Sequence, residues 1–369
     1  MLRWMLKTLW LQKISVVVSA TGVAVAFVLV VVMDAAFVGE SRKIVAYIEN
    51  ANADVWVMQR GVSNMHMATT YVWDWKVDKV RQIPGVQKAT PILYANTAIK
   101  AGGRNWFAYI VGLLPDGRRA GPWEVSSGKL LPGKGEIILP QPIATMAGLN
   151  IGDEAGIGDR VFRIAGLSEE TFSMANSIAF VSFYDLEDLI DASGVVSFIL
   201  VDIEEGGNPE HVARRIEEGV AKISAVPHAR FVKNDFQIAM LMGVEVISFM
   251  TVIGSILAAL IIAFAAYSQV ARRRRELAII KTLGFRNSSL YLAVAVQSFV
   301  ITVLALGMAL AISVILVPAL SAAAPVISLE VTDAALLRMS AIALIVALVA
   351  ALFPAWLVAR VDPLSAFKV

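Results

Sequence analysis

The segment "GKLLPGKG", Gly128 to Gly135, nearly matches the phosphate-binding pattern G-x-x-x-x-G-K-[ST]. In that motif a hydroxyl residue follows the lysine and binds Mg²⁺, but here that position is Gly135. The next residues, "EIILP", have the composition of a strand, whereas a phosphate-binding loop opens a helix. We interpret the segment as a glycine-rich turn before a strand. HExxH and GxSxG motifs are also absent from the sequence, so we do not expect this chain to be an enzyme or to hydrolyse ATP.

A second group of chemically capable residues lies in "VMQRGVSNMHM", which places Met58, Met65, His66 and Met67 close together. Thioether and imidazole groups can bind haem or copper. Their spacing fixes no coordination geometry, so we favour packing and loop roles for them. The chain has no cysteine, which excludes disulfides, thiolate metal sites and cysteine nucleophiles. We therefore predict that the chain itself binds no metal or cofactor.

The composition is that of a membrane protein. Hydrophobic residues make up 57% of the 369 residues and charged residues only 17%, whereas soluble domains carry about a quarter charged residues. Since about 20 apolar residues cross a bilayer as a helix, uncharged runs indicate spans. Four such runs occur, at 14–33, 246–271, 287–329 and 339–359. The third is too long for one span, and we expect Pro318 to end its helix.

The sequence thus predicts four transmembrane helices, at 14–38, 246–271, 291–317 and 339–359. The first apolar run is longer than the core of a signal peptide, so we expect it to remain uncleaved. Eleven basic and two acidic residues lie in the segments 1–13, 272–290 and 360–369. Segment 34–245 instead holds 20 basic and 26 acidic residues. Because basic residues accumulate on the cytoplasmic side, both termini are predicted to be cytoplasmic. Segments 39–240 and 318–338 are then external.

The large external segment has the signals of a folded α+β domain. "ADVWVMQ" (53–59) and "SFILVDI" (197–203) have strand composition. "NPEHVARRIEEGVAKI" predicts a helix with Asn208 as its N-cap and Pro209 in its first turn. In the glycine- and proline-rich stretch 118–166, "GEIILP" and "GDRVFRIAG" indicate a small β insert.

Four segments together carry a family resemblance: 80–91 ("VRQIPGVQKATP"), 135–167, 272–290 ("RRRRELAIIKTLGFRNSSL") and 354–368. They resemble permease subunits of ABC transporters of the MacB/FtsX/LolC type, which include DevC-like and haem-exporter-like permeases. The similarity extends over essentially the whole chain. It implies an α-helical integral membrane protein with four transmembrane helices and a large external α+β domain, made of a porter-like part and a small β insert.

The resemblance also implies partners. A separate cytoplasmic ATPase would bind ATP and Mg²⁺, and a second permease copy, identical or different, would complete a dimer in a bacterial cytoplasmic membrane. Some relatives add a periplasmic adaptor and an outer-membrane channel. Membrane lipids surround such a protein, and nucleic acid is not expected as a partner. In this family, closure of the ATPases moves the external domains, which is called mechanotransmission.

The segment "ARRRRELAIIKTLGFRNSSL", 271–290, directly follows a predicted span. Its arginines would hold the helix end at the lipid headgroups, at about 1 kcal/mol per basic residue. An apolar stripe and a glycine C-cap follow. From the residues alone a membrane-surface anchor is the simpler interpretation. The resemblance instead assigns ATPase coupling to Arg275, Glu276, Leu277, Ile280, Lys281, Leu283 and Gly284.

Met240, Met242 and Glu245 lie at the expected external mouth of the second span. An acid beside polarizable side chains at a membrane boundary is a candidate substrate contact, and a solvated helix end is the ordinary alternative.

Three functions remain open on the sequence: export or extraction of an amphipathic or hydrophobic compound, FtsX-like activation of an external cell-wall hydrolase without transport, and a sensor or scaffold that meets no ATPase.

Overall fold

The protein forms two compact units. The computed structural model describes residues 13–66, 68–172, 177–272, 279, 282, 287–323, 327–334, 336–338, 340–345 and 348. The described residues of the first unit, called the helical unit here, fall within Met1–Val38, Glu245–Ala324 and Leu329–Val369. The second, called the sheet unit, comprises Gly39–Val244 and Pro325–Ser328.

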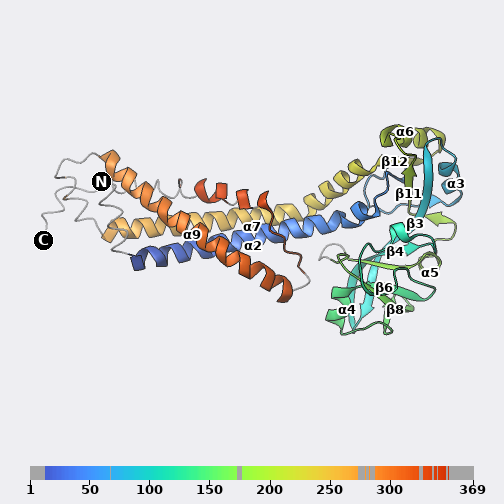
Figure 1. Cartoon of the computed structure of the whole chain (residues 1–369), viewed down its shortest axis with the longest axis horizontal. Helices are drawn as coiled ribbons and strands as arrows, with labels where there is room; N and C mark the ends of the chain where they lie inside the picture. The colour runs from blue at the N-terminus through green and yellow to red at the C-terminus, as the bar shows by residue number, and fades with distance from the viewer. Residues whose placement is uncertain are drawn as a thin grey trace. The chain divides into compact units, whose positions relative to one another are not determined.

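Three long helices dominate the helical unit: α2 (Lys13–Ala51), α7 (His228–Arg272) and α9 (Asn287–Ala323). Figure 1 shows α2 and α7 as uninterrupted ribbons, and both contribute residues to both units. Among the described residues, two helical stretches are long and apolar enough to cross a membrane, Val16–Ala51 and Ala295–Ala323. Shorter apolar stretches lie at Val252–Ile261 and Leu336–Ile345. The count of four spans therefore stays a prediction.

The expectation that Pro318 ends the third helix is wrong, because α9 continues through it to Ala323. A proline inside a helix removes one backbone donor and crowds the preceding turn, but the other backbone groups still need partners. In an apolar environment only continued helix supplies them, and serine hydroxyls help where a bond is lost. Just after the proline, Ser321 Oγ donates to the Val317 carbonyl at 3.1 Å. The helices also outrun the predicted spans, since α2 continues past 38 and α7 begins before 246.

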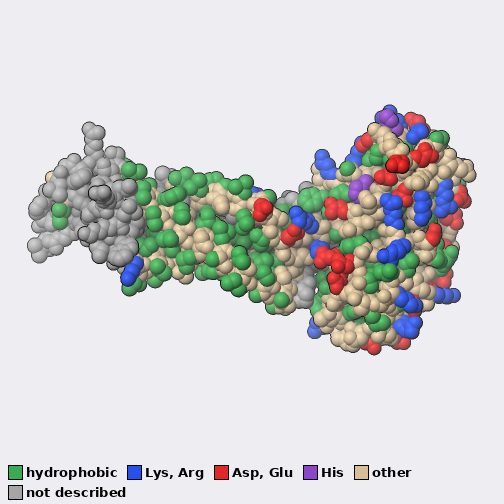
Figure 2. All heavy atoms as spheres, in the orientation of Figure 1, with side chains coloured by type: hydrophobic (Ala, Val, Ile, Leu, Met, Phe, Trp, Pro, Cys, Tyr) green, Lys and Arg blue, Asp and Glu red, His purple; other side chains and the backbone are tan. Residues whose placement is uncertain are grey.

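The helical unit packs through small and β-branched residues. Val23 and Phe27 of α2 and Ala305 and Ala309 of α9 are buried in one cluster. A Cβ atom on Gly254 of α7 would lie 2.8 Å from Val30 Cγ2, so glycine permits the close approach of α2 and α7. Figure 2 shows hydrophobic side chains over the visible face of this unit, whereas charged side chains of both signs cover that of the sheet unit. An apolar outer surface of this kind is suited to lipid.

The sheet unit is built on one long mixed sheet, in the order β12-β1-β11-β3-β4-β9-β6-β8-β5, with β7 paired to β3 and β8. Its strands are β1 (Val55–Gln59), β3 (Val86–Ala101), β4 (Arg104–Leu113), β5 (Val125–Gly128), β6 (Glu136–Pro140), β7 (Glu154–Ile157), β8 (Arg160–Ser168), β9 (Ile178–Ser182), β11 (Phe198–Ile203) and β12 (Ile223–Pro227). A separate pair joins β2 (Val72–Trp73) to β10 (Val195–Val196). The helices are α3 (Trp75–Arg81), α4 (Gln141–Ala147), α5 (Phe183–Leu189) and α6 (Pro209–Gly219), with a 3₁₀ turn, η1, at Arg118–Ala120.

Several predicted elements are confirmed. Strands β1 and β11 fall in the two segments of strand composition, "GEIILP" contains β6, and "GDRVFRIAG" contains all but the last two residues of β8. Helix α6 begins with the expected cap, because Asn208 Oδ1 accepts from the Glu210 N–H at 2.9 Å and from the His211 N–H at 3.3 Å. These signals are local, which is why a single sequence shows them.

The stretch interpreted as a small β insert is continuous with the main sheet. Strands β5 to β8 lie in or just beyond it, and β9 connects them to β4, pairing parallel with β4 and antiparallel with β6. The 16-residue strand β3 pairs with β11 along its first part and with β4 and β7 further on. The long β3 therefore belongs to both parts of the sheet unit.

Two hydrophobic clusters lie on opposite faces of the sheet. Along β1 the side chains alternate between them, with Val55 and Val57 in one cluster and Trp56 and Met58 in the other. The first cluster includes Val212 and Ile216 of α6, whereas the second includes Tyr47 of α2. One face is thus covered by short helices, and the other receives the long helices.

Glu136 of β6 generates a test of this fold. Its carboxylate is buried and accepts from Lys129 Nζ at 2.8 Å, Arg163 Nη2 at 2.7 Å and the Gly133 N–H at 3.0 Å. The Lys129 hydrogen bond is the largest cause that lowers the pKa of Glu136 from 4.5 to about 2; burial opposes it, and the Gly133 and Arg163 bonds support it. A depressed pKa means that the stabilisation is complete above the unfolded pKa and is lost as the pH falls toward the folded value.

We expect Glu136→Gln to lower the thermal midpoint of the detergent-solubilised full chain above pH 5. Between pH 4.5 and 2 the natural protein should lose stability faster than the variant, so the two curves converge. Intrinsic tryptophan fluorescence during heating measures both midpoints. If the thermal midpoints of the natural protein and the variant fell in parallel across this pH range, the role of the Glu136 carboxylate would be contradicted.

Candidate functional site

The two long helices meet the sheet at one pair of strands. Helix α2 ends at Ala51, shortly before β1, and α7 begins at His228, directly after β12. Strands β1 and β12 pair antiparallel, with Val55 opposite Pro227. We call this region of the sheet unit the helix–sheet junction; its central residues are Tyr47, Trp56, Arg119, Phe231 and Asp235.

Aromatic packing forms the apolar half of the junction. Trp56 of β1 stacks on Phe231 of α7 with ring centroids 4.8 Å apart and an interplanar angle of 20°. Tyr47 of α2 contacts the Trp56 ring edge to face at 6.4 Å. All three side chains are fully buried. Since such pairs add about 0.5–1.5 kcal/mol each to the burial of their area, a shift of either helix relative to β1 would be costly.

Arg119 attaches the end of α2 to the sheet. Its Nε donates to the Ala51 carbonyl at 3.1 Å, and its guanidinium also contacts the Asn52 carbonyl and forms an ion pair with Asp202 of β11. The last carbonyls of a helix lack partners within the helix, and a cation there is favourable. The Tyr47 hydroxyl adds a bond to the Ala120 carbonyl at 2.9 Å.

Asp235 attaches the start of α7 to the segment between β1 and β2, residues 60–71, called the β1–β2 loop. This carboxylate is fully buried and accepts from the Met65 N–H at 2.7 Å, the His66 N–H at 3.2 Å and His66 Nδ1. Asn234 Nδ2 donates to the Ser63 carbonyl at 3.0 Å. Because a buried carboxylate requires such donors, α7 and the loop are held together.

The β1–β2 loop lines a cavity of about 420 Å³, which we call the Tyr94 cavity. Tyr94 of β3 stacks on Tyr109 of β4 with centroids 5.2 Å apart, and the His66 ring stands edge to face on Tyr109 at 5.0 Å. Burial is the main cause that raises the pKa of both tyrosines, and the negative charge of Asp235 raises it further. Both phenols therefore stay protonated at neutral pH and remain hydrogen-bond donors.

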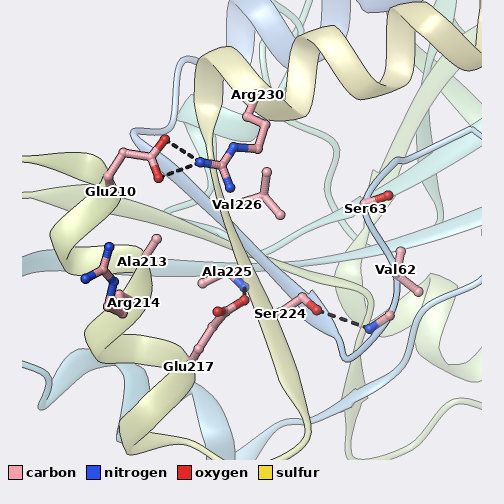
Figure 3. A pocket seen from close by; sticks show the side chains of 11 residues that line it. Val62, Ser63, Glu210, Ala213, Arg214, Glu217, Ser224, Ala225, Val226 and Arg230 are labelled. Atoms are coloured by element: carbon pink, nitrogen blue, oxygen red, sulfur yellow. Dashed lines mark hydrogen bonds and ion pairs between the residues drawn. The ribbon is translucent and has the colours of Figure 1, made fainter.

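A second hollow, of about 350 Å³, lies between α6, β12 and the β1–β2 loop (Figure 3). Glu210 and Arg230 point toward one another across it and form an ion pair at 2.7 Å. Glu217 Oε1 accepts from the Ala225 N–H of β12 at 2.9 Å. Strand β12 is an edge of the sheet, and Pro227 offers no N–H there. These residues protect an open edge from pairing with other chains, so we assign the hollow a structural role.

The structure places the residues predicted for function as follows. Those of the coupling segment, Arg275, Glu276, Leu277, Ile280, Lys281, Leu283 and Gly284, lie outside the described residues, and their role stays a prediction. Met240, Met242 and Glu245 belong to α7, but their side chains are not among those described. Since α7 continues on both sides of them, Glu245 does not stand at a helix end. Substrate contact by these three residues also stays a prediction.

The methionine and histidine group is part of the junction. Met58 and Met65 are buried in the aromatic cluster, His66 pairs with Asp235, and Met67 lies outside the described residues. Within the part of the chain that the structure describes, no three His, Cys, Asp or Glu side chains form a group that could hold a metal ion. Packing, the interpretation that the sequence favoured, is confirmed for Met58 and Met65.

Sequence reasoning missed Asp235, Arg119, Tyr94 and Tyr109. Asp235 meets His66 across 169 positions of sequence, and no local pattern connects them. One weak signal was present. "HARFVKNDFQIAM" begins a long apolar helix with polar residues, and such residues near a predicted span need partners elsewhere in the fold.

Long apolar helices that continue into a mixed sheet are the architecture of a membrane-anchored protein with a folded domain beside the bilayer. The sequence model of the MacB-like periplasmic core domain matches residues 16–218, and that of the FtsX-like permease C-terminal region matches residues 248–363. The first match alone covers more than half of the chain. The chain belongs to the MacB/FtsX-like family of ABC transporter permeases.

Individual relatives agree with this assignment. An uncharacterized ABC transporter permease of Mycobacterium tuberculosis is 25% identical over 324 residues, which cover 87% of this chain and 86% of the relative. Its counterpart in Mycobacterium bovis has the same values. Among solved structures, the periplasmic region of MacB from Actinobacillus actinomycetemcomitans covers 52% of this chain and 97% of its own, with 13% identity and a TM-score of 0.39. The extracellular domain of the transporter YknZ covers 47% of this chain and 100% of its own, at 12% identity and a TM-score of 0.38.

Proposed function

We propose that this ABC transporter permease exports or extracts an amphipathic or hydrophobic substrate by mechanotransmission. A separate ATPase binds the cytoplasmic side, and its cycle moves α2 and α7. The helices move the external sheet unit, so that substrate need not pass between the membrane helices. The helix–sheet junction is the observation that supports this mechanism.

The lengths of the two helices suit the transmission of force. At 1.5 Å per residue, the 45 residues of α7 make a rod of about 68 Å and the 39 residues of α2 one of about 58 Å. The hydrocarbon core of a bilayer needs only about 30 Å. One end of each helix lies in the junction, where Trp56 packs against both Tyr47 and Phe231. Because packed cores have discrete arrangements and do not deform continuously, movement of a rod carries the sheet with it.

Membership of the ABC permease family implies a partner ATPase, and the absence of nucleotide-binding motifs from this chain agrees with a separate polypeptide. We place its docking site in the 272–290 segment, and we propose a dimer with a second permease copy. Nothing in the junction requires a cofactor.

An FtsX-like role is the second candidate. The C-terminal match to FtsX-like permeases is compatible with it, and the same long helices and junction would serve it. In that role the sheet unit activates an external cell-wall hydrolase and nothing is exported. ATPase activity that rises with a hydrophobic substrate supports transport, whereas stable binding of a hydrolase to the sheet unit supports signalling.

The first expected outcome concerns the orientation of the chain in the membrane. With the 272–290 segment in the cytoplasm and the sheet unit outside, single cysteines at Ser126 and Ser288 should differ in intact cells. An impermeant thiol reagent should label Ser126→Cys and leave Ser288→Cys unlabelled until the membrane is opened. The chain has no natural cysteine to interfere. Labelling of Ser288→Cys alone would reverse the orientation.

The second expected outcome tests whether α7 transmits movement as a rigid helix. Gln237 is an exposed residue of α7 just after Asp235, and a proline there costs about 3 kcal/mol and breaks the helix. In the natural complex we expect ATP with vanadate to change hydrogen exchange at the Met65 and His66 amides, which donate to Asp235. Gln237→Pro should abolish this change while ATP hydrolysis continues, and Gln237→Ala should preserve it. An unaltered nucleotide effect in Gln237→Pro would contradict transmission through α7.

The third outcome tests ATPase docking. Burial of a leucine in a partner groove contributes about 1.5–3 kcal/mol, and an unpaired carboxylate in its place costs more. Leu283→Asp should therefore reach the membrane in normal amount, lose the co-purifying ATPase and lose transport. Leu283→Met conserves volume and should retain both. If Leu283→Asp kept its ATPase and full activity, the segment would be only a membrane-surface anchor.

A further inference from the structure

A segment that follows α9 forms hydrogen bonds to α2. It consists of residues 327–334 and 336–338 and is called the clasp segment here. The Ser328 N–H donates to Glu40 Oε1 of α2 at 2.9 Å. The Glu330 N–H donates to the Ala35 carbonyl of α2, also at 2.9 Å. The contact therefore extends over more than one turn of α2.

An ion pair completes the contact between the clasp segment and α2. Asp34 is the first charged residue after the uncharged run 14–33. Its side chain is 17% exposed, and Arg338 Nη2 donates to both of its carboxylate oxygens at 3.1 Å. A carboxylate at the end of an apolar span is partly withdrawn from water, so a cation beside it offsets a large desolvation cost. Arg338 supplies that cation from a position ten residues after Ser328 in sequence.

The residues after Arg338 attach the same stretch of chain to the apolar cluster of the helical unit. Leu336–Ile345 is one of the shorter apolar stretches, and its Ala343 is buried in the cluster that contains Phe27 of α2 and Ala305 of α9. The ion pair and this cluster therefore connect α2 to the chain that follows α9 through two kinds of contact.

The order of the helices along the chain gives these contacts a task. Helix α7 leads into the 272–290 segment, where we place the docking site of the ATPase, and α9 begins within it. Helix α2 is separated from that segment by the whole sheet unit in sequence. A movement that starts there reaches the apolar part of α2 through contacts with other helices. Apolar packing is non-directional, whereas the clasp segment adds bonds of defined geometry.

We propose that the Asp34–Arg338 ion pair is the positioning contact that holds the clasp segment on α2 and makes α2 follow the movement of α9. The hold itself requires neither the ATPase nor a substrate, whereas its part in the movement rests on the proposed mechanotransmission. The main-chain bonds of Ser328 and Glu330 report whether the segment is held.

The first measurement uses the full chain in lipid nanodiscs without nucleotide. Asp34→Asn combined with Arg338→Gln, called the neutral variant, removes the ion pair and leaves no unpaired charge that would disturb folding. Hydrogen exchange at the Ser328 and Glu330 amides, followed by mass spectrometry, should become about three- to tenfold faster, the range expected for the loss of one net hydrogen bond. The charge-reversed variant, Asp34→Arg with Arg338→Asp, should restore most of the protection.

Arg160→Gln is the matched control, because Arg160 is a half-exposed arginine of the sheet unit that pairs with Asp188 at 3.6 Å. It should leave hydrogen exchange at Ser328 and Glu330 unchanged. Unaltered exchange at both amides in the neutral variant, or no recovery in the charge-reversed variant, would overturn the proposal.

The second measurement uses the complex with the ATPase, with ATP and vanadate, in which the Met65 and His66 amides report the movement of α7. If α2 follows α9, nucleotide should leave exchange at Ser328 and Glu330 of the natural chain unchanged and accelerate it further in the neutral variant. Opening of these bonds in the natural chain, or no nucleotide effect on them in the neutral variant, would show that the ion pair does not couple the helices. An absent response at Met65 and His66 in the natural complex would instead refute the proposed function, and the nucleotide-free measurement would still decide whether the ion pair holds the segment.

Discussion

The packing of Trp56 against Phe231 and Tyr47 is the interaction on which the rest of the sheet unit depends. It joins the central strand pair of the junction to the last turns of α2 and the first turns of α7. Burial of three large aromatic rings around one strand residue leaves no room for either helix to slide independently. Strand β12 leads directly into α7 beside this contact, and Asp235, one turn further along α7, holds the β1–β2 loop that lines the Tyr94 cavity.

Polar groups complete the junction where aromatic packing cannot. The carbonyls at the end of α2 need donors, and Arg119 supplies them while it pairs with Asp202. The β1–β2 loop has backbone donors that no strand partner uses, and Asp235 accepts from two of them. Each of these charged side chains thus satisfies backbone groups of another element. These contacts connect helix ends to loops and not only to strands.

Much of the local structure followed from the sequence. The β-branched and aromatic composition of β1 and β11 and the Asn208 cap of α6 are short-range signals, and the structure confirms them. The membrane character followed from composition, and the family followed from four short motifs. Pro318 shows where a local rule was insufficient, because propensity predicts a helix end there, whereas the surrounding apolar run favours continued helix. The extension of α2 and α7 beyond their apolar segments was also not predicted, because uncharged runs were the only signal for the long helices and both extensions carry charged residues.

The sequence by itself determined the class of protein, its apolar segments and four of the strands of the sheet unit, because composition and periodicity act over a few residues. Only the tertiary structure decided that the ends of two helices, separated by the whole sheet unit in sequence, meet at one strand pair. It also decided that His66 faces Asp235 and that Tyr94 stacks on Tyr109 beside a cavity. These contacts depend on strand order and register, which are set by the sum of many long-range contacts. No single segment of the chain contains that information.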